Sequence, residues 1–208
     1  MEIPKLGVLI SGRGSNLQAL IDAIAGGTLR ATIAVVISNI ATAQGLDRAR
    51  RAGIETLVMP HTGSSRDAYD RALVHALEQR RVNLVCLAGF MRLLGPSFIA
   101  AFPDRILNIH PSLLPAFPGL DAQRQAFDHG VKITGATVHI VNAELDAGPI
   151  LLQASVPVLP GDTVASLAER ILEAAHRIYP QAVQLMLDGG WEIEGRRLIF
   201  TARTEAES

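Results

Sequence analysis

Short apolar runs alternate with amphipathic segments along the first 110 residues of the chain. The apolar runs predict strands at residues 6–10, 33–37, 56–59, 84–88 and 105–109. The amphipathic segments, which open near a polar residue or a proline, predict helices at residues 16–25, 41–52, 66–79 and 96–101. Regular alternation of strands and helices is typical of a parallel sheet that is covered by helices on both faces. We therefore expect a doubly wound, Rossmann-like α/β fold.

The pattern changes after residue 110. A stretch rich in proline and glycine, residues 111–119, precedes a short helix and two longer strands. We expect these strands at about residues 132–141 and 149–156, joined by a turn at residues 143–148. Since two strands joined by a short turn run antiparallel, the C-terminal half predicts an antiparallel extension of a mostly parallel sheet.

The last part of the chain predicts one long helix and a hairpin. The helix covers residues 163–187, and Pro180 predicts a kink within it. Residues 191–200 predict a small hairpin before a polar tail. Because neither an internal repeat nor a long linker interrupts the pattern, we expect a single domain.

The composition agrees with a large aliphatic core, since 49% of the residues are hydrophobic and 19% are charged. Lysine and arginine (19) nearly balance aspartate and glutamate (20) without long blocks of one sign, which argues against nucleic acid or a membrane surface as a partner.

The sole cysteine, Cys86, lies in an apolar run, so we expect a buried structural thiol and a reducing compartment. Because neither a signal-peptide pattern nor an apolar run of ~20 residues is found, we expect a cytoplasmic protein.

Residues 11–17 (SGRGSNL) lie between the first predicted strand and the first predicted helix. Glycines let the backbone approach a ligand and free N–H groups at a helix start bind anions, so a phosphate is the natural ligand of this loop. Leu17 takes the place of the third glycine of a dinucleotide-binding loop, and the Gly-Lys-Ser/Thr sequence of a Walker loop is absent. A tight turn without a ligand is the alternative interpretation.

Two polar residues, Asn108 and His110, stand at the end of the fifth predicted strand. Alternation along a strand places both side chains on one face, at the carboxyl edge where open α/β sheets bind ligands. An amide that donates a hydrogen bond beside an imidazole that donates a proton can stabilise a developing oxyanion. The alternative is a structural histidine whose hydrogen bonds are satisfied within the fold.

Asp146 lies in the turn ELDAGP between the two later strands. A local Asx turn is one interpretation. The other requires the fold to bring Asp146 to His110, where a carboxylate favours the protonated form of the imidazole. His139 on the preceding strand could complete a metal site with these two residues, but the H-x-H and H-x-x-x-H spacings of dedicated metal sites are absent, and a strand histidine often only orients its neighbours.

The sequence offers no candidate for a covalent nucleophile. The G-x-S-x-G elbow is absent, and Cys86 lies inside a predicted strand rather than at a helix start. The remaining possibility is a ternary complex in which two bound substrates react directly with each other.

Four segments together resemble the phosphoribosylglycinamide formyltransferases, a folate-dependent family of purine synthesis. They are residues 10–18 (ISGRGSNLQ), 87–92 (LAGFMR), 107–115 (LNIHPSLLP) and 144–150 (ELDAGPI). The resemblance covers roughly residues 5–188 in unbroken order, and the combination is specific although each segment alone is weak.

The resemblance implies that the chain transfers the formyl group of 10-formyltetrahydrofolate to the glycine amine of N1-(5-phosphoribosyl)glycinamide in de novo purine (IMP) biosynthesis. The loop with Gly14 to Asn16 would hold the 5′-phosphate of this acceptor. Asn108 and protonated His110 would stabilise the oxyanion. Asp146 would keep His110 charged and, through water, help to move the proton from the attacking amine to the leaving folate nitrogen. These three residues form the catalytic trio, and the resemblance implies no metal.

The resemblance also implies a folate site. The residues that would hold the folate are Arg66, Met91, Arg92, Leu93, Leu94, Asn108, Val141, Asn142, Ala143, Glu144, Leu145 and Asp146. The single domain of residues 1–208 would then comprise a phosphate-binding half (about 1–110), a folate-binding and catalytic half (111–190) and a terminal hairpin with a polar tail (191–208). We expect it to act on these two small molecules as a monomer or weak homodimer.

Two positions depart from the family's pattern. Ala175 stands where the family commonly has a glutamate that looks like a ribose contact, and Glu173 cannot replace it because positions two apart on a helix point to nearly opposite sides. Residues 121–125 (DAQRQ) differ from the usual helix start with histidine or asparagine. We expect weaker acceptor binding or another ribose contact.

Other functions stay open. Formyltetrahydrofolate hydrolases and methionyl-tRNA formyltransferases belong to the same superfamily, but they usually carry an N-terminal regulatory domain or a C-terminal tRNA-binding domain, and we expect neither in 208 residues. A sugar-phosphate- or nucleotide-binding module without activity and a metal-dependent hydrolase are the alternatives from other classes.

Overall fold

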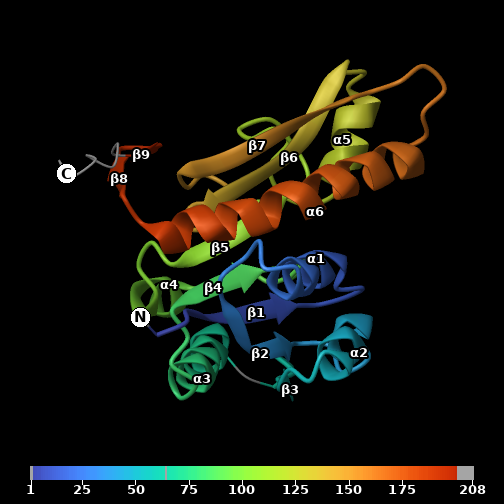
Figure 1. The fold of residues 1–208 in the computed structure, drawn as a ribbon. Helices are drawn as coiled ribbons and strands as arrows, with labels where there is room; N and C mark the ends of the chain where they lie inside the picture. The colour runs from blue at the N-terminus through green and yellow to red at the C-terminus, as the bar shows by residue number, and fades with distance from the viewer. Residues whose placement is uncertain (1, 64, 201–208) are drawn as a thin grey trace.

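A computed structural model describes residues 2–63 and 65–200 of the chain. The strands are β1 Lys5–Ile10, β2 Thr32–Ser38, β3 Thr56–Val58, β4 Leu84–Leu87, β5 Ile106–His110, β6 Ile133–Ile140, β7 Ile150–Pro157, β8 Trp191–Glu194 and β9 Arg197–Phe200. The helices are α1 Ser15–Ala25, α2 Gln44–Arg51, α3 Arg66–Glu78, α4 Pro96–Ala101, α5 Ala122–Asp128 and α6 Val164–Asp188. The described strands form one sheet in the order β3-β2-β1-β4-β5-β6-β7-β9-β8 (Figure 1).

The sheet is parallel in its N-terminal half and mixed beyond it. The five strands from β3 to β5 pair in parallel. β6 runs antiparallel to β5, and β7 runs antiparallel to β6. The terminal hairpin of β8 and β9 adds to the far edge, where β9 pairs with β7. The predicted α/β fold, its antiparallel extension and its terminal hairpin are therefore confirmed.

Helices cover both faces of the sheet (Figure 1). α1 and α6 lie together on one face, where α6 crosses β5, β6 and β7. Val8 and Ile10 of β1 pack into the core on this face, whereas Leu9 packs into the core formed with α3 and α4. Burial on both faces is the reason why the parallel strands read as continuous apolar runs. No helix among residues 2–63 and 65–200 is both long and apolar enough to cross a membrane.

Some boundaries differ from the predicted ones. α2 begins at Gln44 rather than at residue 41, because residues 41 and 42 form a turn and Ala43 has the extended backbone of a capping residue. β5 continues to His110, one residue beyond the prediction, since β6 pairs with it up to that position. Pro180 lies within α6 and does not end it, and the predicted kink at this proline stays a prediction.

Tyr179 ties α6 to the parallel part of the sheet. Its side chain is fully buried, and its hydroxyl lies 2.9 Å from the carbonyl oxygen of Leu87 and 3.3 Å from that of Leu107. Because a carbonyl oxygen only accepts, the hydroxyl shares its one hydrogen between the two strands, which satisfies a polar group that would be costly to bury alone. α6 is thereby fixed across β4 and β5, next to the strand end that carries Asn108 and His110.

Cys86 provides a simple test of this packing. The thiol is free and fully buried in β4, as predicted, and burial raises its pKa to about 12. Since the thiolate is the reactive form, we expect iodoacetamide to leave Cys86 unmodified in the native protein at mildly alkaline pH and to alkylate it fully in denaturant. Mass spectrometry measures both states, and rapid alkylation of the native protein would contradict the buried position.

Candidate active site

Strands β5 and β6 bring four polar side chains together on one face of the sheet. In their antiparallel register, Asn108 lies opposite His139 and His110 lies opposite Thr137. Residues directly opposite each other on an antiparallel pair share a face. The apolar residues between them pack into the α6 core, so the four polar side chains lie on the other face. The common face predicted for Asn108 and His110 is confirmed.

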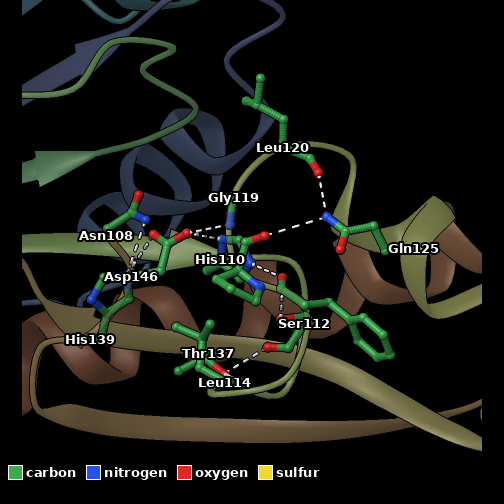
Figure 2. Close-up of polar contacts among 12 residues, drawn as sticks. Asn108, His110, Ser112, Leu114, Gly119, Leu120, Gln125, Thr137, His139 and Asp146 are labelled. Atoms are coloured by element: carbon green, nitrogen blue, oxygen red, sulfur yellow. Dashed lines mark hydrogen bonds and ion pairs between the residues drawn. The ribbon is translucent and has the colours of Figure 1, made fainter. Parts of the chain in front are cut away.

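Asp146 reaches both histidines from the turn between β6 and β7 (Figure 2). Its Oδ2 atom lies 3.5 Å from His110 Nδ1, and its Oδ1 atom lies 3.6 Å from His139 Nε2. The backbone of Asp146 is left-handed with φ 49°, a conformation that aspartate tolerates better than most residues. The turn lies tightly against β6, because a Cβ atom on Gly148 would be 1.8 Å from the Ile140 carbonyl oxygen. The fold thus meets the condition for a functional role of Asp146, which is contact with His110.

Both ring nitrogens of His110 face oxygen acceptors. Nδ1 faces the Asp146 carboxylate, and Nε2 lies 2.9 Å from the carbonyl oxygen of Phe117. Because a carbonyl oxygen only accepts, Nε2 carries a hydrogen, and only the doubly protonated ring can donate to both acceptors. The residue is 4% exposed, so these contacts are shielded from water. An oxygen acceptor that displaced the Phe117 carbonyl would receive the hydrogen bond from His110 Nε2.

His139 orients the amide of Asn108 (Figure 2). His139 Nδ1 lies 3.0 Å from the carbonyl oxygen of Ile140 and donates to it, which leaves Nε2 of the neutral ring as an acceptor. Asn108 Nδ2 lies 3.2 Å from that Nε2 atom and donates to it. In the protonated ring Nε2 instead donates to Asp146 Oδ1, 3.6 Å away, and this is the contact with His139 that lowers the Asp146 pKa. Since an amide nitrogen carries two hydrogens, the second N–H of Asn108 stays available to a reacting oxygen.

The Asp146 carboxyl group is held in its ionised form. Burial raises its pKa, but contact with His139, the N–H of Gly119 and the charge of His110 together lower it by more. The Gly119 nitrogen donates to Asp146 Oδ2 at 2.8 Å. The net pKa therefore lies below the ordinary value of 3.8, so that a carboxylate faces His110 throughout the neutral range.

The lowered pKa of Asp146 predicts a pH dependence of stability. A carboxyl group with a depressed folded-state pKa adds stability that is complete above its unfolded-state pKa and is lost as the pH falls through its folded-state pKa. The free energy of unfolding of the wild type should therefore fall relative to that of Asp146→Asn as the pH is lowered from neutrality towards about 3. Denaturant titrations at several pH values measure this difference, and a difference independent of pH would contradict the depressed pKa.

Buried hydrogen bonds fix the segment that follows β5. Thr137 Oγ1 donates to the Ser112 carbonyl oxygen at 2.7 Å, and it accepts from the Leu114 nitrogen at 3.0 Å and from Gln153 Nε2 at 2.9 Å. Thr137 is fully buried, so each of these bonds satisfies a group that water cannot reach. The network anchors the chain that carries the Phe117 carbonyl onto β6 and β7.

The predicted phosphate-binding residues line a cleft of about 400 Å³. Its walls include residues 12–16, Met91 after β4, and residues 109 and 111, which are the neighbours of His110 in the chain. Ser11, residues 88 and 89, α6 and the start of α5 contribute the rest of the lining. A ligand that is held by the loop can therefore extend towards the end of β5, which carries Asn108 and His110.

The loop ends in the backbone geometry of an anion site. Gly14 is left-handed with φ 69° and directly precedes α1, which begins at Ser15. The first N–H groups of a helix have no partner within the helix, and the helix dipole places partial positive charge there. Asn16 lines the same cleft, and the N–H groups of its side-chain amide are of the kind that donates to an anion. The geometry supports the predicted phosphate interpretation.

Both departures from the family pattern lie on this cleft. Ala175 of α6 lines it and is 3% exposed, and its methyl group offers no hydrogen bond to a sugar. Gln123, from the unusual start of α5, lines the same cleft and offers an amide. An amide on α5 thus lines the cleft that Ala175 lines without a polar group.

The predicted folate residues near α4 divide into exposed and buried ones. Met91 and Leu93 are 68% and 61% exposed, whereas Leu94 is buried in the core with α3 and α4. Arg66 Nη2 donates to the Leu94 carbonyl oxygen at 2.6 Å, so Arg66 holds the backbone of this segment. Arg92 is half-buried. Exposed apolar side chains beside this cleft suit the flat ring system of a folate.

The predicted folate residues 141–146 form the turn that carries Asp146. The Val141 nitrogen donates to the Ile106 carbonyl oxygen, which anchors the start of the turn on β5. Asn142 Oδ1 accepts from the Glu144 nitrogen at 3.1 Å, so an Asx turn forms at Asn142 rather than at Asp146. Leu145 is 55% exposed and Ala143 is also exposed. Asn142 thus shapes the turn, and the Asp146 side chain contacts residues outside it.

The metal-site alternative concerned His110, His139 and Asp146. In the part of the chain that the structure describes, no group of three or more His, Cys, Asp or Glu side chains is arranged to hold a metal ion. Both nitrogens of His139 have partners, which are the carbonyl of Ile140 and the amide of Asn108. The geometry favours the orienting role of His139.

Sequence reasoning missed several groups that shape the site. Thr137 was missed, although together with His139, whose orienting role was one interpretation of the sequence, it repeats the polar-x-polar spacing of Asn108 and His110. The carbonyl of Phe117 and the N–H of Gly119 act through the backbone of an irregular loop. Backbone groups of this kind leave no pattern of side chains in a sequence.

Comparison with known proteins identifies the family of the chain. The family model described as formyl transferase matches residues 4–183. Phosphoribosylglycinamide formyltransferase of Escherichia coli is 48% identical over 183 residues, which are 88% of this chain and 86% of that protein. The human trifunctional purine biosynthetic protein adenosine-3 is 50% identical over 186 residues, which are 89% of this chain but only 18% of the human protein.

A solved structure shows the same fold. Glycinamide ribonucleotide transformylase 1 from Symbiobacterium toebii superposes with a TM-score of 0.94 at 56% sequence identity, covering 96% of this chain and 94% of that one. Similarity of this extent in sequence and structure, together with the matched family model, leaves one assignment. The chain belongs to the formyl transferase family, as its four motif segments predicted.

Proposed function

We propose that this chain transfers the formyl group of 10-formyltetrahydrofolate to the amine of N1-(5-phosphoribosyl)glycinamide. The observation that carries the proposal is the meeting of Asn108, His110 and Asp146 beside a cleft that begins at an anion-binding loop. The names of the Escherichia coli and Symbiobacterium toebii relatives support the same activity, and the chain spans most of both proteins.

The acceptor would lie along the cleft. Its phosphate would bind the N–H groups of Gly14, Ser15 and Asn16 at the start of α1, where the helix dipole favours an anion. Its amine would then extend towards the residues that flank His110 in the chain. Holding both reactants in one cleft turns a bimolecular reaction into an effectively unimolecular one, which supplies a large part of the rate.

The formyl donor would lie between the exposed side chains of Met91 and Leu93 and the turn with Asp146. The neutral amine attacks the formyl carbon, a C–N bond forms, and the carbonyl oxygen becomes an oxyanion. This oxyanion would replace the Phe117 carbonyl as acceptor of the His110 Nε2 hydrogen and would take the second N–H of Asn108. A charged acceptor binds such donors more strongly than a neutral carbonyl does, so the stabilisation is largest in the transition state.

Collapse of the intermediate requires one proton to change place. The nitrogen of the attacking amine must lose a proton, and the folate nitrogen must gain one as its bond to the formyl carbon breaks. Asp146 is the ionised group beside His110, and its carboxylate can accept this proton and return it, directly or through a water molecule. The products are the formylated amine and the deformylated folate, and no covalent enzyme intermediate is formed.

The experiment that tests the proposal is a spectroscopic assay of the purified protein. 10-Formyl-dideazafolate serves as donor and glycinamide ribonucleotide as acceptor, with and without EDTA. Turnover that depends on the acceptor and resists EDTA is the expected result. Turnover without the acceptor would instead indicate a formylfolate hydrolase, and loss of turnover in EDTA would indicate a metal-dependent enzyme.

Binding without turnover is the remaining outcome. An inactive sugar-phosphate-binding module would bind ribose 5-phosphate and leave the formyl donor unchanged, and this result would overturn the proposed transfer. The cytoplasmic location and the monomeric or weakly dimeric state stay predictions.

A further inference from the structure

Three consecutive carbonyl oxygens of the loop at residues 11–17, those of Gly12, Arg13 and Gly14, accept hydrogen bonds from the protein. The donor and acceptor pairs are Gly45 N to Gly12 O (3.0 Å), Arg48 Nε to Arg13 O (2.9 Å) and Gln18 N to Gly14 O (2.9 Å). Two of the three donors belong to α2, and the third belongs to α1 itself. Carbonyl oxygens repel a phosphate, whereas backbone N–H groups attract it. The contacts from α2 therefore occupy carbonyl oxygens of the loop that would otherwise repel a phosphate.

α2 also touches the loop through its backbone. A Cβ atom on Gly14 would lie 2.5 Å from the Cα atom of Gly45. A Cβ atom on Gly45 would lie 2.5 Å from Ile10 Cδ1 and 3.1 Å from the Gly14 Cα atom. Such close approach requires glycine on both sides. A shift of α2 would consequently move the loop with it.

Arg48 of α2 forms hydrogen bonds with both the loop and α1. Its Nε atom donates to the Arg13 carbonyl oxygen at 2.9 Å, and its Nη1 atom lies 3.3 Å from Gln18 Oε1 on α1. The side chain lines a second cleft of about 590 Å³, and Ser15 lines both this cleft and the first one. Burial and then the charge of Arg48 lower the pKa of His176 in the same cleft, so this charge acts on its surroundings. Arg48 thus combines a bond to the loop with a positive charge beside the start of α1.

We propose that Arg48, seated by Gly45, is a positioning residue that holds the loop in its anion-binding conformation and so sets the affinity for the phosphate of the acceptor. The identity of the acceptor rests on the proposed function, whereas the phosphate chemistry can be tested without turnover. Arg48 acts through the Arg13 carbonyl and does not touch the reacting atoms. Its contribution is therefore to acceptor binding and not to the formyl-transfer step.

The kinetic test compares Arg48→Met with the wild type on two acceptors, glycinamide ribonucleotide and its dephosphorylated riboside. Loss of a charge-assisted hydrogen bond should raise KM for the phosphorylated acceptor roughly 10-fold. Uniform loss of binding leaves kcat within about twofold, and KM for the formyl donor should not change either. The riboside carries no phosphate, so its kcat/KM should be the same for both proteins. An equal loss of kcat/KM with both acceptors would overturn the proposal.

Two further variants separate positioning from general packing. Arg50→Met is the matched control, because Arg50 lies on the same helix, is exposed and pairs with Asp47 at 2.8 Å, and wild-type kinetics are expected. Arg48→Lys keeps the charge and a donor, so it should recover part of the affinity for the phosphorylated acceptor alone. If Arg48→Met does not fold, as judged by circular dichroism, Arg48→Lys provides the measurement. A lysine variant that is impaired equally with both acceptors would contradict positioning.

A binding experiment distinguishes failure of this inference from failure of the proposed function. Ribose 5-phosphate and ribose are titrated calorimetrically into the wild type and into Arg48→Met or Arg48→Lys. Tighter binding of the phosphorylated sugar by the wild type, weakened roughly 10-fold in Arg48→Met, supports the inference even if no formyl transfer occurs. Unchanged affinity in the Arg48 variants, or no preference of the wild type for the phosphate, overturns it even if formyl transfer is observed.

Discussion

Asp146→Asn is expected to lower kcat by roughly 10³-fold, the scale of a lost general acid–base contribution. Asparagine has the same shape as aspartate and tolerates the left-handed backbone of this position, so the turn should keep its conformation. The amide oxygen can still accept from Gly119, but it carries no negative charge towards His110. His110 would lose its charged partner, and the proton of the attacking amine would lose its acceptor.

Steady-state kinetics with both substrates measure this effect, and circular dichroism verifies the fold. Asp104→Asn is the matched control, because Asp104 has the same left-handed backbone with φ 54° and lies exposed between α4 and β5. We expect wild-type kinetics for this control. A kcat of Asp146→Asn within tenfold of the wild type would remove Asp146 from the proposed proton path.

Gly14→Ala is expected to lower kcat/KM for glycinamide ribonucleotide by on the order of 100-fold, through weaker binding of the phosphate. The added methyl group would meet the Cα atom of Gly45 at 2.5 Å, and this atom belongs to the backbone and cannot rotate away. The left-handed φ of 69° adds strain of about 1 kcal/mol for any residue with a side chain. The loop and α2 must therefore separate, which disturbs the N–H groups at the start of α1.

Gly27→Ala separates backbone strain from the steric contact. Gly27 has a similar φ of 73°, but nothing lies within 4 Å of its added Cβ atom. This control should lose stability in thermal melting and keep its kinetics with both acceptors. If Gly14→Ala also kept its kcat/KM for the phosphorylated acceptor, the loop around Gly14 would not be the phosphate site.

The strands and helices could be predicted because their signals are local. Apolar runs such as that of β1 are buried on both faces, with Val8 and Ile10 in one core and Leu9 in the other. The boundaries that were wrong depend on neighbours in space. β5 includes His110 because β6 pairs beside it, and α2 starts late because the chain turns before its capping residue.

The same distinction between local signals and contacts in space applies to the candidate site. The positions of Asn108 and His110 at the end of one strand, and of Gly14 at a helix start, follow from the order of residues over one short stretch. Contact between Asp146 and His110 depends instead on the antiparallel register of β6 and on the turn that follows it. The roles of Thr137 and His139 depend on that register as well.

The sequence by itself determined the elements, the face shared by Asn108 and His110, and the glycine-rich loop, since periodicity and backbone sterics act between residues that are close in the chain. Only the tertiary structure decided which groups meet: the carboxylate of Asp146 with two histidines, the Phe117 carbonyl with His110, and α2 with the loop. These contacts join residues that are far apart in the chain or lie in irregular backbone. They form because packing of the whole core outweighs the entropy of closing the loops between them, and a local pattern does not record that balance.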